Sequence, residues 1–89
     1  MMEQLIKENA GVALLIKQQW AQRLDNRAIL IFACTVSHLR FHLKMDRDQI
    51  IAFFALAIGR DISNEQDKEY VTQEFEYLMG EMDVRGVYG

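Results

Sequence analysis

Hydrophobic residues recur along the chain with the period of an α-helix, in four stretches that short polar segments separate. The chain contains no proline, and its alanine, leucine, glutamine and glutamate content favours helix. Gly11 weakens the first stretch, where it could mark a kink, a helix start or a close helix crossing. We therefore predict an all-α fold, a small four-helix bundle-like domain over residues 1–89 that forms a dimer. The predicted helices span residues 3–24, 27–44, 47–58 and 64–82, with a flexible tail over residues 83–89.

Capping residues mark the ends of the predicted helices. Asp25 or Asn26 is suited to cap the second helix. Asp46, with Gln49 three residues later, has the spacing of a capping box at the start of the third helix. Gly59 follows the third helix in the usual position for a stop. A second capping-box pattern predicts the start of the fourth helix, and it consists of Ser63 and Gln66.

Two of the four predicted helices are apolar on almost all sides. Their central runs, "AILIFACTV" and "IIAFFALAI", leave no polar face for solvent. A four-helix domain has room for one central helix, so a second one implies an apolar surface that another subunit covers. Adjacent phenylalanines in the second run point about 100° apart, which is unfavourable for packing both into one core. We therefore expect a homodimer, whose predicted interface residues are Phe32, Ile51, Phe53 and Phe54.

Charge is distributed unevenly along the chain. Residues 1–60 carry eight Lys or Arg and five Asp or Glu, a net charge of +3. Residues 61–89 carry two and eight, a net charge of −6, which suits a basic partner. The single cysteine excludes an internal disulfide, and the longest apolar runs are far shorter than the roughly 20 residues of a membrane-spanning helix. We therefore expect a cytoplasmic protein without a membrane span.

All cysteine and histidine side chains lie within "CTVSHLRFH", at intervals of four residues. Cys34 and His42 are about 12 Å apart along a helix, so the three side chains cannot bind one ion. His38 and His42 are the candidate metal ligands, but the chain offers no further Cys or His to complete a site. Cys34 is expected to be a small core residue. Because no nucleophile–base pair, phosphate-binding loop or dinucleotide motif is present, we expect neither a cofactor nor enzymatic activity.

The fourth predicted helix carries a second line of residues beside its core stripe. Tyrosine is enriched at the centres of protein interfaces, and carboxylates attract a basic partner. The leading hypothesis is therefore a non-enzymatic protein–protein interaction module, such as a small regulator, inhibitor or adaptor, that presents this line to a protein partner. The predicted partner-binding residues are Tyr70, Glu74, Tyr77 and Glu81, at spacings of four, three and four.

Two alternatives use other residues. The first is a dimeric DNA-binding transcriptional regulator, with residues 47–58 as the recognition helix; its apolar sequence and the negative net charge of the chain argue against this. The second is a helical metal-binding protein that uses His38 and His42. In the first alternative, the side chains expected to contact phosphates are Arg27, Arg40, Lys44, Arg47 and Arg60.

Overall fold

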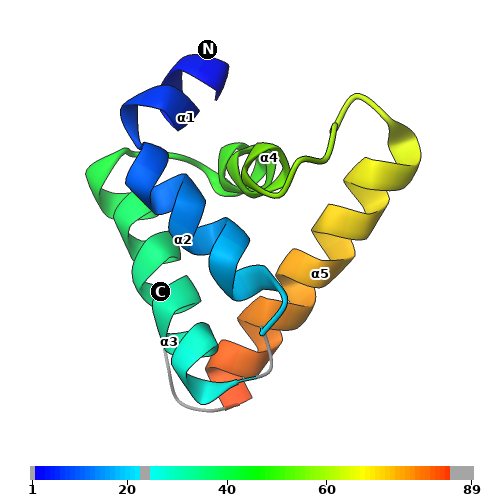
Figure 1. Ribbon diagram of the computed structural model, residues 1–89. Helices are drawn as coiled ribbons and strands as arrows, with labels where there is room; N and C mark the ends of the chain where they lie inside the picture. The colour runs from blue at the N-terminus through cyan, green and yellow to red at the C-terminus, as the bar shows by residue number, and fades with distance from the viewer. Residues whose placement is uncertain (1, 23–24, 85–89) are drawn as a thin grey trace.

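The computed structural model describes residues 2–22 and 25–84, which form five α-helices and one π-helix (Figure 1). Within these residues there is no strand, so the predicted all-α class is confirmed. No helix in this part of the chain has both the length and the apolar character that crossing a membrane requires. The elements are, in chain order, α1 (Met2–Glu8), α2 (Ala10–Trp20), α3 (Asn26–Ser37), the π-helix η1 (His38–His42), α4 (Arg47–Ala57) and α5 (Glu65–Val84).

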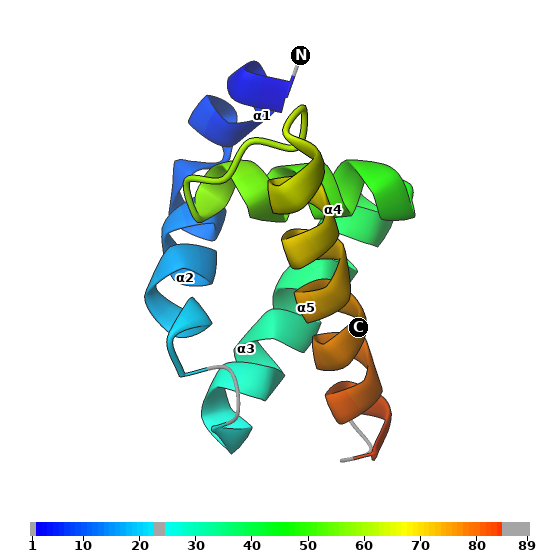
Figure 2. The ribbon, with the colours of Figure 1, turned by 90° about the vertical axis from the view of Figure 1, so that its right-hand side faces the viewer.

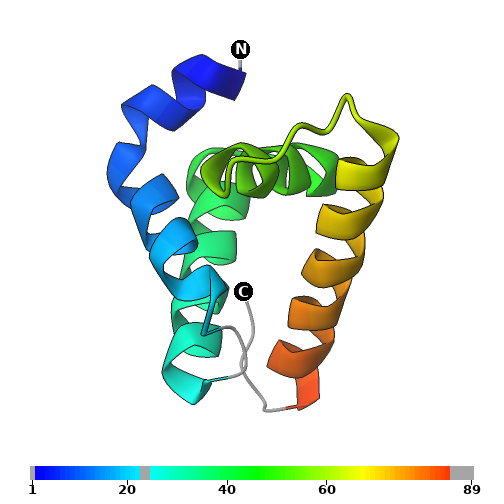
Figure 3. The same ribbon diagram turned by 45° about the vertical axis from the view of Figure 1, so that its right-hand side comes forward.

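Helix α4 lies across one end of the molecule, and α2, α3 and α5 extend away from it. In Figure 3 it runs crosswise near the top, with α2 and α3 below it on one side and α5 on the other. Helix α2 packs against α3, and α5 packs against both α3 and α4. The short α1 packs against α4 and α2, and lies at the same end of the molecule as α4 in Figure 2. The arrangement is bundle-like, with one helix crosswise to the others.

Four aromatic rings, one from each of α2 to α5, form the centre of the core. The ring of Trp20 meets those of Phe32 and Phe54 edge-on, with centroids 6.1 and 6.3 Å away. Phe54 also lies 6.1 Å from Phe32 and meets Phe75 edge-on at 5.5 Å. Edge-to-face pairs of this kind stabilise a fold beyond the burial of their surface. The cluster ties four helices together through Phe54, which contacts the other three rings.

The residues expected at a subunit interface lie inside this core. Phe32, Phe53 and Phe54 are fully buried within the single chain, and Ile51 is only 6% exposed. Phe53 and Phe54 are both buried, although they point in different directions, because α1, α2, η1 and α5 all pack against α4. The inference that a second apolar helix needs a second subunit is corrected accordingly. Because these four side chains are buried within one chain, they cannot contact a second subunit in this structure.

The capping residues of α3 and α4 are those that the sequence predicts. The Asp25 carboxylate accepts a hydrogen bond from the Arg27 N–H at 2.7 Å. Asp46 and Gln49 form a reciprocal capping box, and both of its hydrogen bonds are 2.9 Å long. Gly59 follows α4 with a φ of 79°, a left-handed conformation that glycine adopts without steric cost. Local side-chain chemistry therefore sets these boundaries.

The start of α5 differs by one residue from the prediction. Its cap is Asn64, whose side-chain oxygen accepts hydrogen bonds from the N–H groups of Gln66 and Asp67 at 2.9 and 3.2 Å. Ser63 instead donates both its N–H and its hydroxyl to the Asp61 carboxylate. The predicted Ser63 capping box is therefore wrong, because a neighbouring asparagine competes for the same position.

The first predicted helix is divided at Asn9, which separates α1 from α2. Asn9 leaves the helical conformation, with φ −124° and ψ 43°, and its side chain donates to the Leu5 carbonyl at 3.0 Å. Gly11 is the second residue of α2 and faces open space. Of the three interpretations of Gly11, a helix start agrees with the structure, whereas a close helix crossing does not. The predicted end of this helix at residue 24 lies outside the described residues.

Candidate binding surfaces on α5 and around the π-turn

Helix α5 is the acidic element of the structure. It ends at Val84, two residues beyond its predicted end, and the rest of the predicted tail, residues 85–89, lies outside the described part of the chain. Its sequence contains seven acidic side chains and one basic side chain, Lys68, a net charge of −6. Its buried residues face α3 and α4. The acidic residues exposed on the opposite side, hereafter the acidic face, are Glu65, Glu69, Glu76 and Asp83.

The four residues predicted to bind a partner do not form one exposed line. Tyr77 is 47% exposed. Tyr70 is half-buried, and the Arg60 guanidinium lies over its ring, 4.4 Å from the centroid. Glu74 and Glu81 are also half-buried. Tyr77 is therefore the member of the predicted line that a partner reaches most fully.

The spacing of the acidic face could have revealed it from the sequence. Its members follow one another at intervals of four, seven and seven residues, which keeps them on one side of a helix. The predicted line of tyrosines and glutamates lies about 100° from the core stripe, at the edge of the buried surface. In the described part of α5, the exposed acidic side chains lie on the side away from the core, where a partner can reach them.

Among the residues that the structure describes, two ion pairs join α5 to the rest of the molecule. The Nη2 atom of Arg47, at the start of α4, lies 2.6 Å from Oε2 of Glu76. The Nη1 atom of Arg60, in the turn before α5, lies 3.2 Å from Oδ1 of Asp67. Partly exposed pairs of this kind contribute up to about 1 kcal/mol each. The two arginines, Arg47 and Arg60, are therefore held in intramolecular contacts.

The turn between α4 and α5 contains a carboxylate with a shifted pKa. The Ser63 hydroxyl donates to Oδ1 of Asp61 at 2.7 Å, and the Ser63 N–H donates to the same atom at 3.0 Å. These hydrogen bonds, with the hydroxyl contributing most, lower the pKa of Asp61. Because the folded state favours the ionised carboxylate, the contribution to stability is present above the ordinary pKa and is lost as pH falls through the lowered value. The hydrogen bonds organise the turn that starts α5.

The predicted second helix changes character near its C-terminal end. Helix α3 ends at Ser37, and the chain continues as the π-helix η1. There the Leu43 N–H donates to the His38 carbonyl, five residues earlier, at 3.2 Å. Lys44 then adopts a φ of 58°, a left-handed conformation that is uncommon for a residue with a side chain. Single π-turns are frequent at functional sites, so this segment is a second candidate region.

The two candidate metal ligands both lie in η1. The rings of His38 and His42 stack, with centroids 5.1 Å apart and planes inclined by 26°. Within the described residues, no three His, Cys, Asp or Glu side chains are grouped so that they could hold a metal ion. Cys34 is exposed, so its expected place in the core is wrong. The core face of α3 is formed by other positions, which include Ile29, Phe32, Ala33 and Val36.

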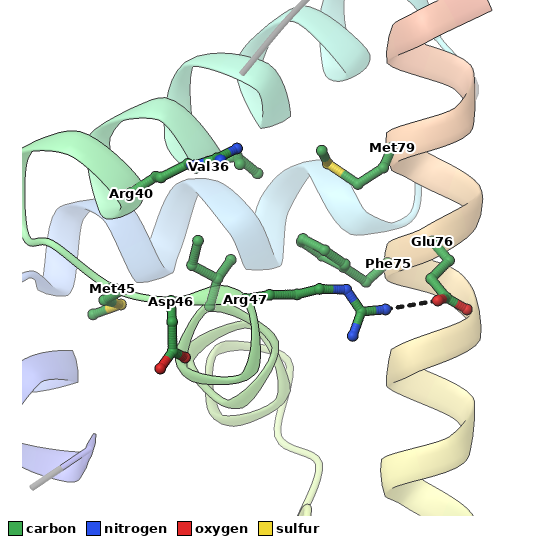
Figure 4. Close-up of a pocket in the computed structure, with 9 residues that line it drawn as sticks. Val36, Arg40, Met45, Asp46, Arg47, Phe75, Glu76 and Met79 are labelled. Carbon is green, nitrogen blue, oxygen red and sulfur yellow. Dashed lines mark hydrogen bonds and ion pairs between the residues drawn. The ribbon is translucent and has the colours of Figure 1, made fainter.

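A cavity of about 520 Å³ lies where α3, η1, α4 and α5 meet (Figure 4). Its volume falls within the roughly 300–1,000 Å³ that is usual for small-molecule sites. Its apolar lining residues are Val36, Met45, Ile50, Phe75 and Met79. Its charged lining residues are exposed to solvent, and they are Arg40, Asp46, Arg47 and Glu76.

Three of the four charged residues around the cavity are already engaged. The Asp46 carboxylate caps α4, and Figure 4 shows the Arg47 guanidinium reaching Glu76. Arg40 lies over the ring of its neighbour Phe41, 5.5 Å from the centroid. With the residues that the structure describes, Arg40 forms no ion pair. The cavity thus combines an apolar lining with one arginine, Arg40, that forms no ion pair among the described residues.

The chain was compared with known proteins at the level of sequence and of structure. No protein-family model, no curated protein and no solved structure matches it. The geometry of the acidic face, of η1 and of the cavity is therefore the basis for a functional proposal.

Proposed function

We propose that this protein is a non-enzymatic binding protein that presents the acidic face of α5 to a basic protein partner. One observation carries the proposal: four acidic side chains are exposed on the side of α5 away from its buried residues, on a helix of net charge −6. One of the four, Glu76, is paired with Arg47, which leaves Glu65, Glu69 and Asp83 without an ion pair among the described residues. Tyr77 is 47% exposed and points about 100° away from Glu76 around the helix, so a partner that covers both must wrap around part of α5. A small regulator, inhibitor or adaptor would act through a surface of this kind.

Electrostatics and burial have separate roles in this proposal. Complementary charge steers a partner toward the acidic face and sets the orientation in which it docks. The ring of Tyr77 then supplies apolar contact area at little cost in side-chain entropy, which is why tyrosine is enriched among the residues that dominate binding energy. A basic helix or basic loop of another protein has the matching chemistry.

Nucleic-acid binding is the alternative with the most direct structural counterarguments. Residues 50–55 of α4, the helix expected to enter a groove, are buried. Arg47 and Arg60 are paired with acidic residues of α5. Of the five basic residues expected to contact phosphates, this leaves Arg27, Arg40 and Lys44, in a chain of net charge −3.

Self-association stays part of the proposal, but it uses a different surface. On α3 and η1, the apolar side chains that reach solvent include Leu30, which is 53% exposed, and Phe41, which is 57% exposed. Cys34, one turn after Leu30, is exposed as well. This surface, hereafter the α3 apolar surface, is the part of the predicted second helix that a second copy could cover.

A charge reversal on the acidic face tests the proposed partner binding. Tagged wild-type protein and the variants Glu69→Lys and Tyr77→Ala are used to capture proteins from the native cell, with quantification by mass spectrometry. We expect one basic protein to be retained by the wild type and lost at least about tenfold with either variant. The matched control is Asp48→Lys, the same charge change at a side chain of α4 that is 95% exposed.

Binding is then measured with the purified proteins. Calorimetric titration of the captured protein should give a dissociation constant that rises about tenfold or more for Glu69→Lys and stays unchanged for Asp48→Lys. Equal losses with both charge reversals would mean that net charge, not the α5 surface, controls binding. Undiminished binding by Glu69→Lys and Tyr77→Ala would contradict the proposal. Circular dichroism of each variant checks that the helices are retained.

A further inference from the structure

The apolar part of the cavity is built by residues that come from three separate parts of the chain. Val36 belongs to α3, Met45 and Ile50 lie before and within α4, and Phe75 and Met79 belong to α5. All five are apolar, so the interior favours a hydrocarbon or aromatic group over water. Thioether side chains adapt to ligands of different shape, and Figure 4 places Met45 and Met79 on opposite sides of the cavity.

The charged residues around the cavity indicate the sign of the ligand. Arg47 and Glu76 neutralise one another at 2.6 Å. The Asp46 carboxylate accepts the Gln49 N–H at 2.9 Å, at the positive end of the α4 dipole. Arg40 remains without an ion pair among the described residues. Arg40 follows Val36 by one turn, so both side chains point to the same side of the helix and toward the cavity.

The backbone beside the cavity departs from regular geometry. The π-turn η1 carries Arg40, and Lys44 adopts its φ of 58° just before Met45. A left-handed conformation costs a residue with a side chain roughly 1–2 kcal/mol, and it persists where the surrounding structure holds it. Such irregular segments are concentrated at ligand sites. The cavity, Arg40 and the irregular backbone thus coincide at one place in the fold.

We infer that this cavity binds a small anionic amphiphile, whose apolar body lies against Phe75 and the two methionines and whose anionic group pairs with Arg40. The apolar lining disfavours a strongly polar body. The Arg40 guanidinium, which forms no ion pair among the described residues, matches one carboxylate, sulfonate or phosphate group. The site shares Glu76 with the acidic face proposed to bind a protein, and Glu76 is already paired with Arg47. The two proposals are therefore tested by variants of other residues, Arg40 for the cavity and Glu69 for the acidic face.

Two aromatic probes that differ in one group test the inference. Anilinonaphthalene sulfonate has an aromatic body and one sulfonate, whereas phenylnaphthylamine has the same body without the charge. We expect the sulfonate to bind at one site per chain, with an affinity at least about tenfold higher than that of the neutral probe. Fluorescence titration of the wild-type protein measures both affinities.

Arg40→Met retains the length of the side chain and removes its charge. This variant should lower the affinity for the sulfonate about tenfold and leave the affinity for phenylnaphthylamine unchanged. Arg27→Met is the matched control, since Arg27 is exposed in the first turn of α3 and does not line the cavity. Equal effects of the two variants on the sulfonate would overturn the inference.

Methionine methyl signals in the wild-type protein locate the bound probe without any substitution. Isotope-labelled methyl groups of Met45 and Met79 should shift on addition of the sulfonate, whereas that of Met82, which is buried in α5 away from the cavity, should not. Shifts of Met82 equal to those of Met45 and Met79, or no shift at all, would contradict the site. Glu69→Lys should leave sulfonate binding intact and Arg40→Met should leave partner binding intact, which separates failure of one proposal from failure of the other.

Discussion

The apolar runs of α3 and α4 look alike in sequence and have different surroundings in the structure. In "IIAFFALAI" the six residues 50–55 are all buried. In "AILIFACTV" the core face is buried, but Leu30 is 53% exposed and Cys34 is exposed as well. The difference follows from the number of neighbours: α1, α2, η1 and α5 pack against α4, whereas α3 lies between α2 and α5 with one side open.

This comparison shows that an apolar run indicates how much surface a helix can bury, not how much it does bury. Helix α4 buries its apolar run because four other elements, α1, α2, η1 and α5, pack against it. Because these four elements all pack against α4, residues that point about 100° apart, such as Phe53 and Phe54, can both enter one core. The remaining apolar surface of α3 is the part that a second subunit or another partner could use.

The largest expected effect comes from removing the ring at the centre of α4. Phe54→Ala leaves a cavity among Trp20, Phe32 and Phe75, and should lower the free energy of unfolding by about 3–5 kcal/mol. Urea denaturation followed by circular dichroism measures this change. For a domain of this size, a loss of that magnitude leaves little stability. A loss below about 1 kcal/mol would show that Phe54 is not packed as described.

An intermediate effect is expected from enlarging a small side chain in each helix. Ala55 of α4 is fully buried, so Ala55→Leu should overpack the core and lower the free energy of unfolding by about 1–3 kcal/mol. Cys34→Leu on α3 should change it by less than about 0.5 kcal/mol, since Cys34 is exposed. Thermal denaturation of both variants measures these two changes in stability. Equal losses would remove the distinction between the two helices.

The smallest effect on stability is expected on the α3 apolar surface. Leu30→Gln should alter the free energy of unfolding by less than about 0.5 kcal/mol, because Leu30 already contacts solvent over half of its surface. If a second copy covers this surface, the variant should instead change the assembly state. Light scattering at micromolar concentration should then give a dimer mass for the wild type and a monomer mass for Leu30→Gln. A monomeric wild type would contradict self-association.

Helix ends could be predicted from the sequence where they depend on a few neighbouring residues. The Asp46–Gln49 capping box and the Gly59 stop depend on residues three to four positions apart, and both occur as expected. The start of α5 is wrong by one residue because Ser63 and Asn64 can each cap a helix, and the hydrogen bonds to Asp61 decide between them. The break at Asn9 lies two residues before Gly11, for which a helix start was one of three possible interpretations. The π-turn at His38 contains no proline or glycine that would indicate it.

By itself the sequence determined the helical class, the capping residues at the starts of α3 and α4 and the acidic character of the last helix, because these depend on neighbours within a turn or two. Only the tertiary structure decided that Phe32, Ile51, Phe53 and Phe54 are core residues and that Cys34 faces solvent. It also decided that Arg40 lines a cavity with residues of α4 and α5. Burial and cavities depend on which segments pack together, and the period of a single helix contains no information about the helices that will cover it.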